Sequence, residues 1–95
     1  MVRPQLVFRS HAVRRMFERQ VTVADIRQIV ETGETIENRP NDPPYPSRLV
    51  LGSAHGRPLH IVVAEQTDQD TTIIVTVYEP DLGNWHPGFR KRRKP

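Results

Sequence analysis

Two histidines, one arginine and one tyrosine form the set of side chains in this sequence with the clearest chemical use. His11 and Arg15 are one helical turn apart, so both side chains would leave a helix on the same side. His60 and Tyr78 lie in two apolar runs that are typical of strands. An imidazole titrates near neutral pH and can move a proton, while a guanidinium can hold a phosphate through its planar fork. The set therefore predicts cleavage of a phosphodiester.

Cleavage of RNA by its own 2′-hydroxyl needs a base, an acid for the leaving oxygen and cations around the phosphate. We predict that His60 is the base or the acid and that Tyr78 orients it or donates a proton. Arg15 would hold the phosphate, and His11 would be a second acid or base. No metal or other cofactor is expected, because the four histidines lack ligand spacing and the chain has no cysteine. The alternative is that the same side chains are structural or simply solvated.

Two helices are predicted near the N-terminus. Ser10 is typical of an N-cap and would begin a helix over roughly residues 11–19. We expect the apolar stripe of this helix to be buried, and it consists of Val13, Met16 and Phe17. Thr22 would cap the next helix, with Asp25 completing an imperfect capping box, and Gly33 would end it. The short link between the two helices predicts an αα-hairpin.

Strand patterns follow the helices. Residues 34–39 could form an edge strand, and three antiparallel strands are expected at residues 48–54, 58–66 and 72–79. Leu6-Val7-Phe8 is either a short strand or a lead-in that packs on the core, and Trp85 and Phe89 would anchor the irregular end. We therefore predict an α+β fold in which an N-terminal αα-hairpin packs on one face of a three- to four-stranded antiparallel sheet.

The alternation of side chains along the strands predicts which residues share a face. The odd-numbered positions of the three strands are apolar, so we expect the helices to pack there. A three-residue turn between the first two strands would set Gly52 opposite His60, and matching faces across the next turn would set His60 opposite Tyr78. These three residues would form a shallow pocket on the other face. Arg48, about 13 Å away along its strand, is a candidate for substrate contact.

Charge is distributed unevenly along the 95 residues. Residues 1–27 carry +4, residues 28–89 carry −6 and residues 90–95 carry +5. We expect one domain at residues 1–89, followed by a basic C-terminal tail at residues 90–95. Arginine outnumbers lysine twelve to two, which favours contacts with phosphate. Further candidates for substrate binding are therefore Arg19, Arg90, Arg92 and Arg93.

The composition also narrows the location and the partners of the chain. No apolar run approaches the roughly 18 residues of a membrane span, and no membrane partner is expected. The absence of cysteine and of an apolar signal core favours the cytoplasm.

Four motifs together resemble a family of small, largely uncharacterised bacterial domains, over about residues 8–90. They are Ser10-His11-Ala12-x-x-Arg15-Met16-x-x-Arg19, the Thr22-x-x-Asp25-Ile26 helix that ends at Gly33, Leu59-His60-Ile61-Val62-Val63, and Thr76-Val77-Tyr78-Glu79-Pro80-Asp81. That family looks like part of the RelE/ParE-like toxin superfamily. The resemblance implies a RelE-like fold and the role of toxin in a type II toxin–antitoxin pair.

The resemblance also implies an activity and two partners. The activity would be metal-independent endoribonuclease cleavage of mRNA, with RNA bound on the ribosome or free. The other partner would be a small antitoxin of the zinc-finger type. The positions that carry over to this sequence are His11, Arg15, Arg19, His60 and Tyr78. ParE-like members of the superfamily act on gyrase and lack the nuclease residues.

Two functions from different classes remain open at this point. The first is an endoribonuclease toxin that binds RNA through Arg15, Arg19 and the basic tail, with its chemistry near His60 and Tyr78. The alternative is a non-catalytic RNA- or protein-binding module of the same fold, in which the histidine and the tyrosine are structural.

Overall fold

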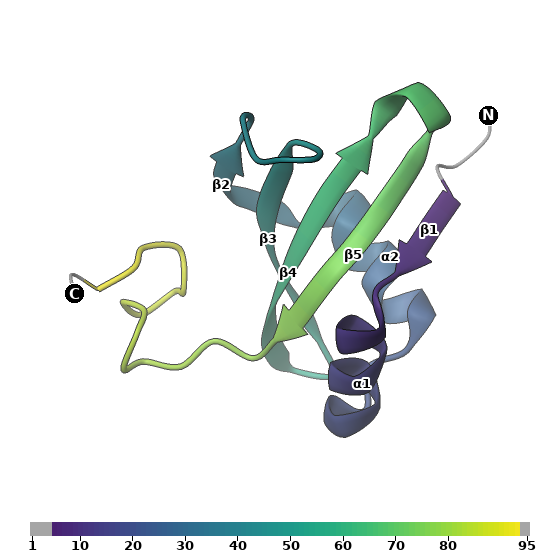
Figure 1. Ribbon diagram of the computed structural model, residues 1–95. Coiled ribbons are helices and arrows are strands. Elements are labelled where there is room, and N and C mark those ends of the chain that lie inside the picture. Colours follow the sequence, from purple (N-terminus) through teal and green to yellow (C-terminus); the bar gives the residue numbers. More distant parts are fainter. Residues whose placement is uncertain (1–4, 94–95) are drawn as a thin grey trace.

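The computed structural model describes residues 5–93, which form two helices on a five-stranded sheet (Figure 1). In chain order the elements are β1 (Gln5–Phe8), α1 (Ser10–Arg19), α2 (Val23–Thr32), β2 (Glu34–Arg39), β3 (Ser47–Ala54), β4 (Arg57–Gln66), a short 3₁₀ helix (Thr67–Gln69) and β5 (Thr71–Tyr78). The predicted α+β class with both helices on one face of the sheet is confirmed. No helix in the described part of the chain is long and apolar enough to span a membrane.

The sheet is mixed, with the strand order β1-β5-β4-β3-β2. β2, β3, β4 and β5 pair antiparallel, whereas β1 pairs with β5 in parallel. The expectation of at most four antiparallel strands was therefore wrong. Leu6-Val7-Phe8 is part of a true edge strand, because it pairs with β5 at Thr72, Ile73 and Ile74.

α2 begins at the N-cap residue that the sequence predicts, whereas the N-cap of α1 lies one residue before the predicted one. The Thr22 hydroxyl accepts a hydrogen bond from the Asp25 amide at 3.1 Å, and the Asp25 carboxylate accepts one from the Thr22 amide at 2.9 Å. This capping box was predicted. In α1 the N-cap is Arg9, so Ser10 is the first helical residue and not the cap.

α1 buries a different stripe from the predicted one. Ala12 and Met16 lie in the core, whereas Val13 is 51% exposed and Phe17 is 85% exposed. The helix is turned so that its small residue lies against the sheet, mainly over β5, while α2 packs over β3. Two apolar side chains are thereby left on the outer surface of α1.

The register of β3 against β4 also differs from the prediction. His55 and Gly56 both have positive φ and form a two-residue turn, the length favoured where two twisted strands meet. His60 therefore lies opposite Leu51 and not opposite Gly52. Because a shift of one residue exchanges the two faces of a strand, Gly52 faces α2, where a Cβ atom would lie 2.6 Å from Ile29.

The pairing of β4 with β5 was predicted correctly at the site of interest. His60 lies opposite Tyr78, and Val62 lies opposite Thr76. A bulge next to Val62 and Val63 then shifts the register, so that Ile74 joins the helix-covered core. We call the side of the sheet that is turned away from α1 and α2 the helix-free face.

Candidate functional site on the helix-free face

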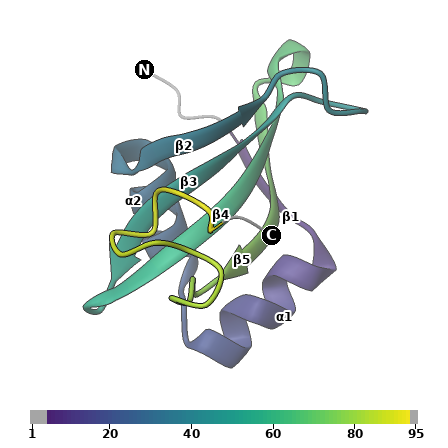
Figure 2. The same ribbon diagram turned by 90° about the vertical axis from the view of Figure 1, so that its left-hand side faces the viewer.

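His60 and Tyr78 meet on the helix-free face, but that part of the face is covered. Residues 80–93, which we call the C-terminal segment, leave β5 and loop back across the sheet (Figure 2). Trp85 of this segment is only 3% exposed and lies edge-on to His60, with the ring centroids 4.4 Å apart. His60 itself is fully buried. The expected role of Trp85 as an anchor is confirmed, and the predicted shallow pocket around His60 is filled by the chain itself.

Both ring nitrogens of His60 are engaged. Nε2 lies 2.9 Å from the backbone carbonyl oxygen of Phe89, and since a carbonyl only accepts, Nε2 carries the hydrogen. In the neutral ring, Nδ1 then accepts a hydrogen bond from the Tyr78 hydroxyl at 3.0 Å. Burial lowers the pKa of His60 and raises the pKa of Tyr78. At neutral pH the pair is an uncharged imidazole and an intact phenol, which join β4, β5 and the C-terminal segment.

The predicted basic tail is largely engaged within the fold. Arg90 donates to Glu34 at 2.8 Å, and Arg93 donates to the carbonyl of Leu82 at 2.6 Å. Arg92 lies over the Trp85 ring, 4.7 Å from its centroid. The segment is thus held by its own arginines as well as by His60. Residues 94–95 of the predicted tail lie outside the described residues.

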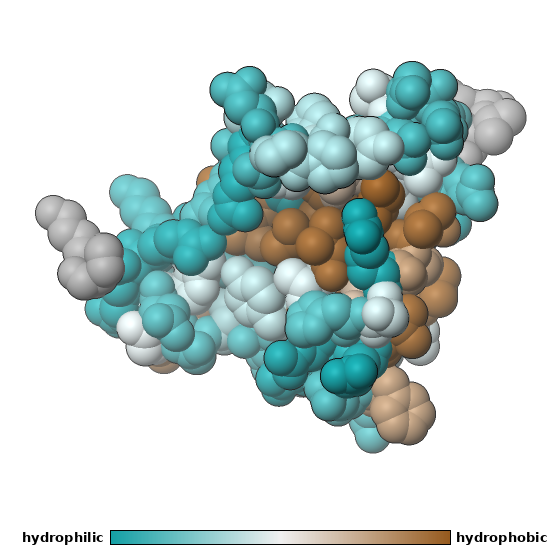
Figure 3. Space-filling model, viewed as in Figure 1, coloured by the Kyte–Doolittle hydropathy of each residue, from teal (hydrophilic) through white to brown (hydrophobic). Residues whose placement is uncertain are grey.

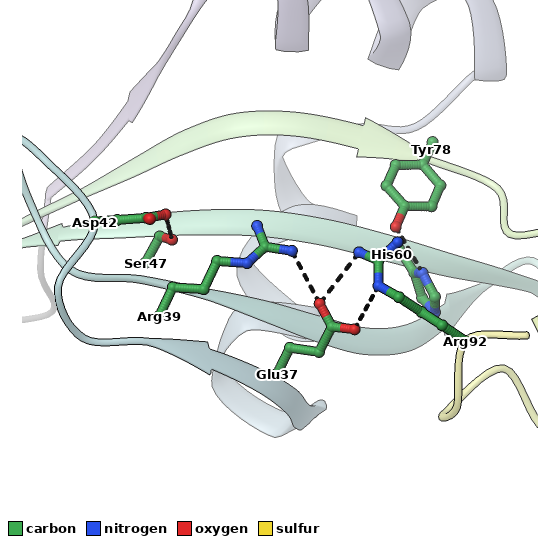
Figure 4. Close-up of polar contacts among 7 residues, drawn as sticks. All are labelled: Glu37, Arg39, Asp42, Ser47, His60, Tyr78 and Arg92. Carbon is green, nitrogen blue, oxygen red and sulfur yellow. Dashed lines mark hydrogen bonds and ion pairs between the residues drawn. The ribbon is translucent and has the colours of Figure 1, made fainter. Parts of the chain in front are cut away.

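A polar cluster beside the buried pair is centred on Glu37 of β2 (Figure 4). Arg92 donates to both carboxylate oxygens, at 2.7 and 3.2 Å, and Arg39 donates to Oε1 at 2.9 Å. These contacts, with Arg92 foremost, lower the pKa of Glu37, so the carboxylate is ionised at neutral pH. One carboxylate between two guanidiniums leaves the cluster with a net positive charge.

This cluster was missed at the sequence level. The contact between Glu37 and Arg39 had a sequence signal, because the two residues are two positions apart on one strand and share a face. The contact between Arg92 and Glu37 had no sequence signal, because Arg92 is 55 residues away and reaches Glu37 only when the C-terminal segment folds back.

A shallow hollow of about 280 Å³ lies on the same face beyond Arg39. Its floor is made of Val62, Ala64 and Val75, and Tyr45 stands in the adjoining loop. Arg9 and Arg39 also line it. Apolar side chains gather in the middle of this face, between hydrophilic margins (Figure 3). The hollow thus places an apolar floor, an aromatic ring, the Arg9 guanidinium and the Asp42 carboxylate next to the Glu37 cluster, with which it shares Arg39.

The other predicted site residues do not join His60. His11 and Arg15 are exposed on α1, which packs on the opposite side of the sheet, and Arg15 lies 3.4 Å from Glu18. Arg19 lies 3.8 Å from Glu79. Arg48 donates to Glu65 and to Thr35 at 2.8 Å, and its strand register turns it to the helix-covered side. The structure thus brings together His60, Tyr78 and Arg92 but not His11, Arg15 or Arg48.

Chemically, the Glu37 cluster and the hollow together offer the guanidiniums of Arg9, Arg39 and Arg92 and the carboxylates of Glu37 and Asp42. No group of three His, Asp or Glu side chains within residues 5–93 could hold a metal ion. A site of this kind can bind an anion such as a phosphate, and it can offer Glu37 as a proton acceptor.

The fold defines a small α+β domain with two N-terminal helices on one face of a mixed sheet. Residues 8–79 match the family described as Domain of unknown function (DUF4258), and the chain belongs to that family. No curated protein and no solved structure matches the chain.

Proposed function

We propose that the protein binds single-stranded RNA on the helix-free face of its sheet. The observation that carries this proposal is that Arg9 and Arg39 line one hollow, while Arg39 and Arg92 both bind Glu37 beside it. Arg9 makes no side-chain hydrogen bond or ion pair with any other described residue. Arg39 uses only Nη2 to contact Glu37, which leaves its other N–H groups for a phosphate.

The surroundings of these arginines favour single strands over duplexes. Unpaired bases stack on aromatic and apolar surfaces while the backbone follows a row of cations. Tyr45 and the floor of the hollow supply such a surface in the same hollow that Arg9 and Arg39 line. A rigid duplex cannot place its bases in so shallow a hollow, because they are stacked and paired inside the helix.

The first test measures RNA binding and its location. We would titrate a fluorescently labelled 12-nucleotide RNA, in the presence of a chelator, with wild-type protein, Arg9→Gln and the matched control Arg14→Gln. Both substitutions remove one arginine charge without breaking an ion pair among the described residues. We expect Arg9→Gln to weaken binding about five- to tenfold, or about 1 kcal/mol, and Arg14→Gln to have little effect. Equal losses in the two variants would refute this location.

The salt dependence counts the phosphate contacts. If Arg9, Arg39 and Arg92 each neutralise one phosphate, log K should fall with log salt with a slope of about −2, since each contact on a single strand contributes about −0.7. A slope about twice as steep would mean that cations elsewhere on the protein bind the RNA.

A second candidate function is RNA cleavage by a toxin of a type II toxin–antitoxin pair. The observation that favours it is the ionised Glu37 carboxylate, 24% exposed and flanked by two guanidiniums. Glu37 could accept the proton of a 2′-hydroxyl while Arg39 and Arg92 hold the phosphate. Tyr78, which keeps its proton and lines the same pocket as Arg92, is the acid of this scheme for the leaving oxygen. In this scheme His60 orients Tyr78 and holds the C-terminal segment in place.

Cleavage is tested on the same RNA and on DNA of the same sequence, again in a chelator. We expect RNA fragments ending in a cyclic phosphate, intact DNA, and loss of cleavage with retained binding in Glu37→Gln. Trp85 fluorescence would show that this variant keeps its C-terminal segment in place. Bound but uncut RNA would exclude the nuclease and leave the binding proposal standing. Growth arrest on expression, relieved by a small protein encoded next to this one, would test the proposed role in a toxin–antitoxin pair.

A further inference from the structure

The outer face of α1 carries two exposed apolar residues with no role in the proposed RNA site. Val13 is 51% exposed and Phe17 is 85% exposed. They are four residues apart, so they form one ridge along the helix. The helix lies on the side of the sheet opposite to the Glu37 cluster. Phe17 is the most exposed large apolar side chain among residues 5–93, and adjoining exposed apolar side chains are typical of an interaction surface.

A pair of opposite charges runs beside this ridge. Arg14 and Glu18 are also four residues apart and both are exposed. Arg14 has no side-chain partner among the described residues. Within residues 5–93, Glu18 contacts only Arg15, at 3.4 Å and with both side chains about half exposed, so the contact is weak. A carboxylate has lone pairs for more than one donor, so Glu18 can accept a second arginine.

We propose that this face of α1 binds the same face of a second copy of the chain, with the two helices antiparallel across a two-fold axis. In such a contact residue i meets residue j of the copy and j meets i. Val13 packs against Phe17 of the second copy, and Arg14 pairs with Glu18 of the second copy. The pair 13 and 17 is centred on residue 15, and the pair 14 and 18 is centred on residue 16. These centres are only about 1.5 Å apart along the helix axis, so one crossing point of the two helices satisfies both pairings. The ridge and the charges are therefore self-complementary.

The size of the contact predicts a weak dimer. A ten-residue helix is about 15 Å long, so one helix pair buries less than the roughly 800 Å² per partner of a standard interface. The dimer is accordingly expected to form at high protein concentration and to dissociate on dilution.

Sedimentation velocity of the full chain over about 10 µM to 1 mM tests the proposal. We expect the mean sedimentation coefficient of the wild type to rise with concentration toward that of a dimer. Phe17→Ser should weaken self-association at least tenfold. The matched control is Val7→Ser, which replaces another exposed apolar residue, 41% exposed on β1, and should leave association unchanged. A wild type that stays monomeric over the whole range would overturn the proposal.

A charge exchange tests the antiparallel pairing itself. Arg14→Glu and Glu18→Arg, each alone, should weaken association, because each places like charges opposite each other twice. The double variant R14E/E18R should restore it, and circular dichroism would show that the helices are intact. The two-fold pairing would be refuted by a different pattern. In that pattern Phe17→Ser abolishes association, but R14E/E18R associates no better than the single charge variants.

A different occupant of the ridge would be visible in the same experiments. A synthetic amphipathic helix with leucines on one side and glutamates beside them serves as the probe. If it binds a wild type that remains monomeric, the ridge serves another protein and not a second copy. RNA binding should be unchanged in Phe17→Ser, which separates this surface from the proposed RNA site.

Discussion

Replacing His60 with alanine should release the C-terminal segment from the sheet. The substitution removes the donor to the Phe89 carbonyl, the acceptor of the Tyr78 hydroxyl and the ring under Trp85. A buried carbonyl without a donor costs about 1–3 kcal/mol, and the space left by a buried ring adds about 2 kcal/mol. The exposed ion pairs of Arg90 and Arg92 are each worth less than about 1 kcal/mol, so they are too weak to hold the segment.

The sole tryptophan of the chain reports this release directly. Trp85 is buried against His60, so in His60→Ala its emission should move to longer wavelength and become more accessible to acrylamide. A loss of about 3–5 kcal/mol also lowers the melting temperature by about 12 °C or more in a domain of this size. The control is His11→Ala, an exposed histidine on α1 that should change stability by less than about 0.5 kcal/mol. Unchanged Trp85 emission and melting temperature in His60→Ala would refute the anchoring role.

Three further predictions concern stability. Because burial lowers the pKa of His60 in the folded state, the unfolded chain binds more protons once the pH falls through about 6.5, so the stability present above that pH is lost progressively as the pH falls below it. Urea titrations should show a smaller loss in His60→Gln, and equal losses would mean that another group titrates. Gly52→Ala should cost about 1–3 kcal/mol in the same assay, because its Cβ meets the stiff Ile29 side chain at 2.6 Å; a neutral result would contradict the observed register. Thr22→Ala removes the cap of α2 and should cost about 1 kcal/mol, whereas Thr22→Asp should keep most of the stability.

Elements set by local sequence were predictable. The Thr22 capping box formed as expected, and the alternation of β4 and β5 placed His60 opposite Tyr78. The β3–β4 register was not predictable in the same way, because Ala54 and Arg57 could each belong to the turn or to the strands. Their inclusion in the strands shortens the turn to His55–Gly56 and turns Gly52 toward the helices.

Features that depend on packing between distant segments could not be predicted. Hydrophobicity alone assigns Phe17 to the core, but Ala12 and Met16 fit closer to the sheet, and Phe17 is left outside. The environment of His60 depends on a carbonyl 29 residues away, at Phe89. The face shared by His60 and Tyr78 was derived correctly, but its accessibility was set by the C-terminal segment.

The path of the C-terminal segment also explains the charge distribution of the sequence. The acidic middle and the basic end neutralise each other in space, because Arg90 and Arg92 fold onto Glu34 and Glu37 of β2. A high isoelectric point therefore overstates the positive charge that is free to attract RNA. The arginines that matter for a ligand are those with unused N–H groups. On the helix-free face Arg9 is one of them, and this is why the proposed site is centred on the hollow and not on the end of the chain.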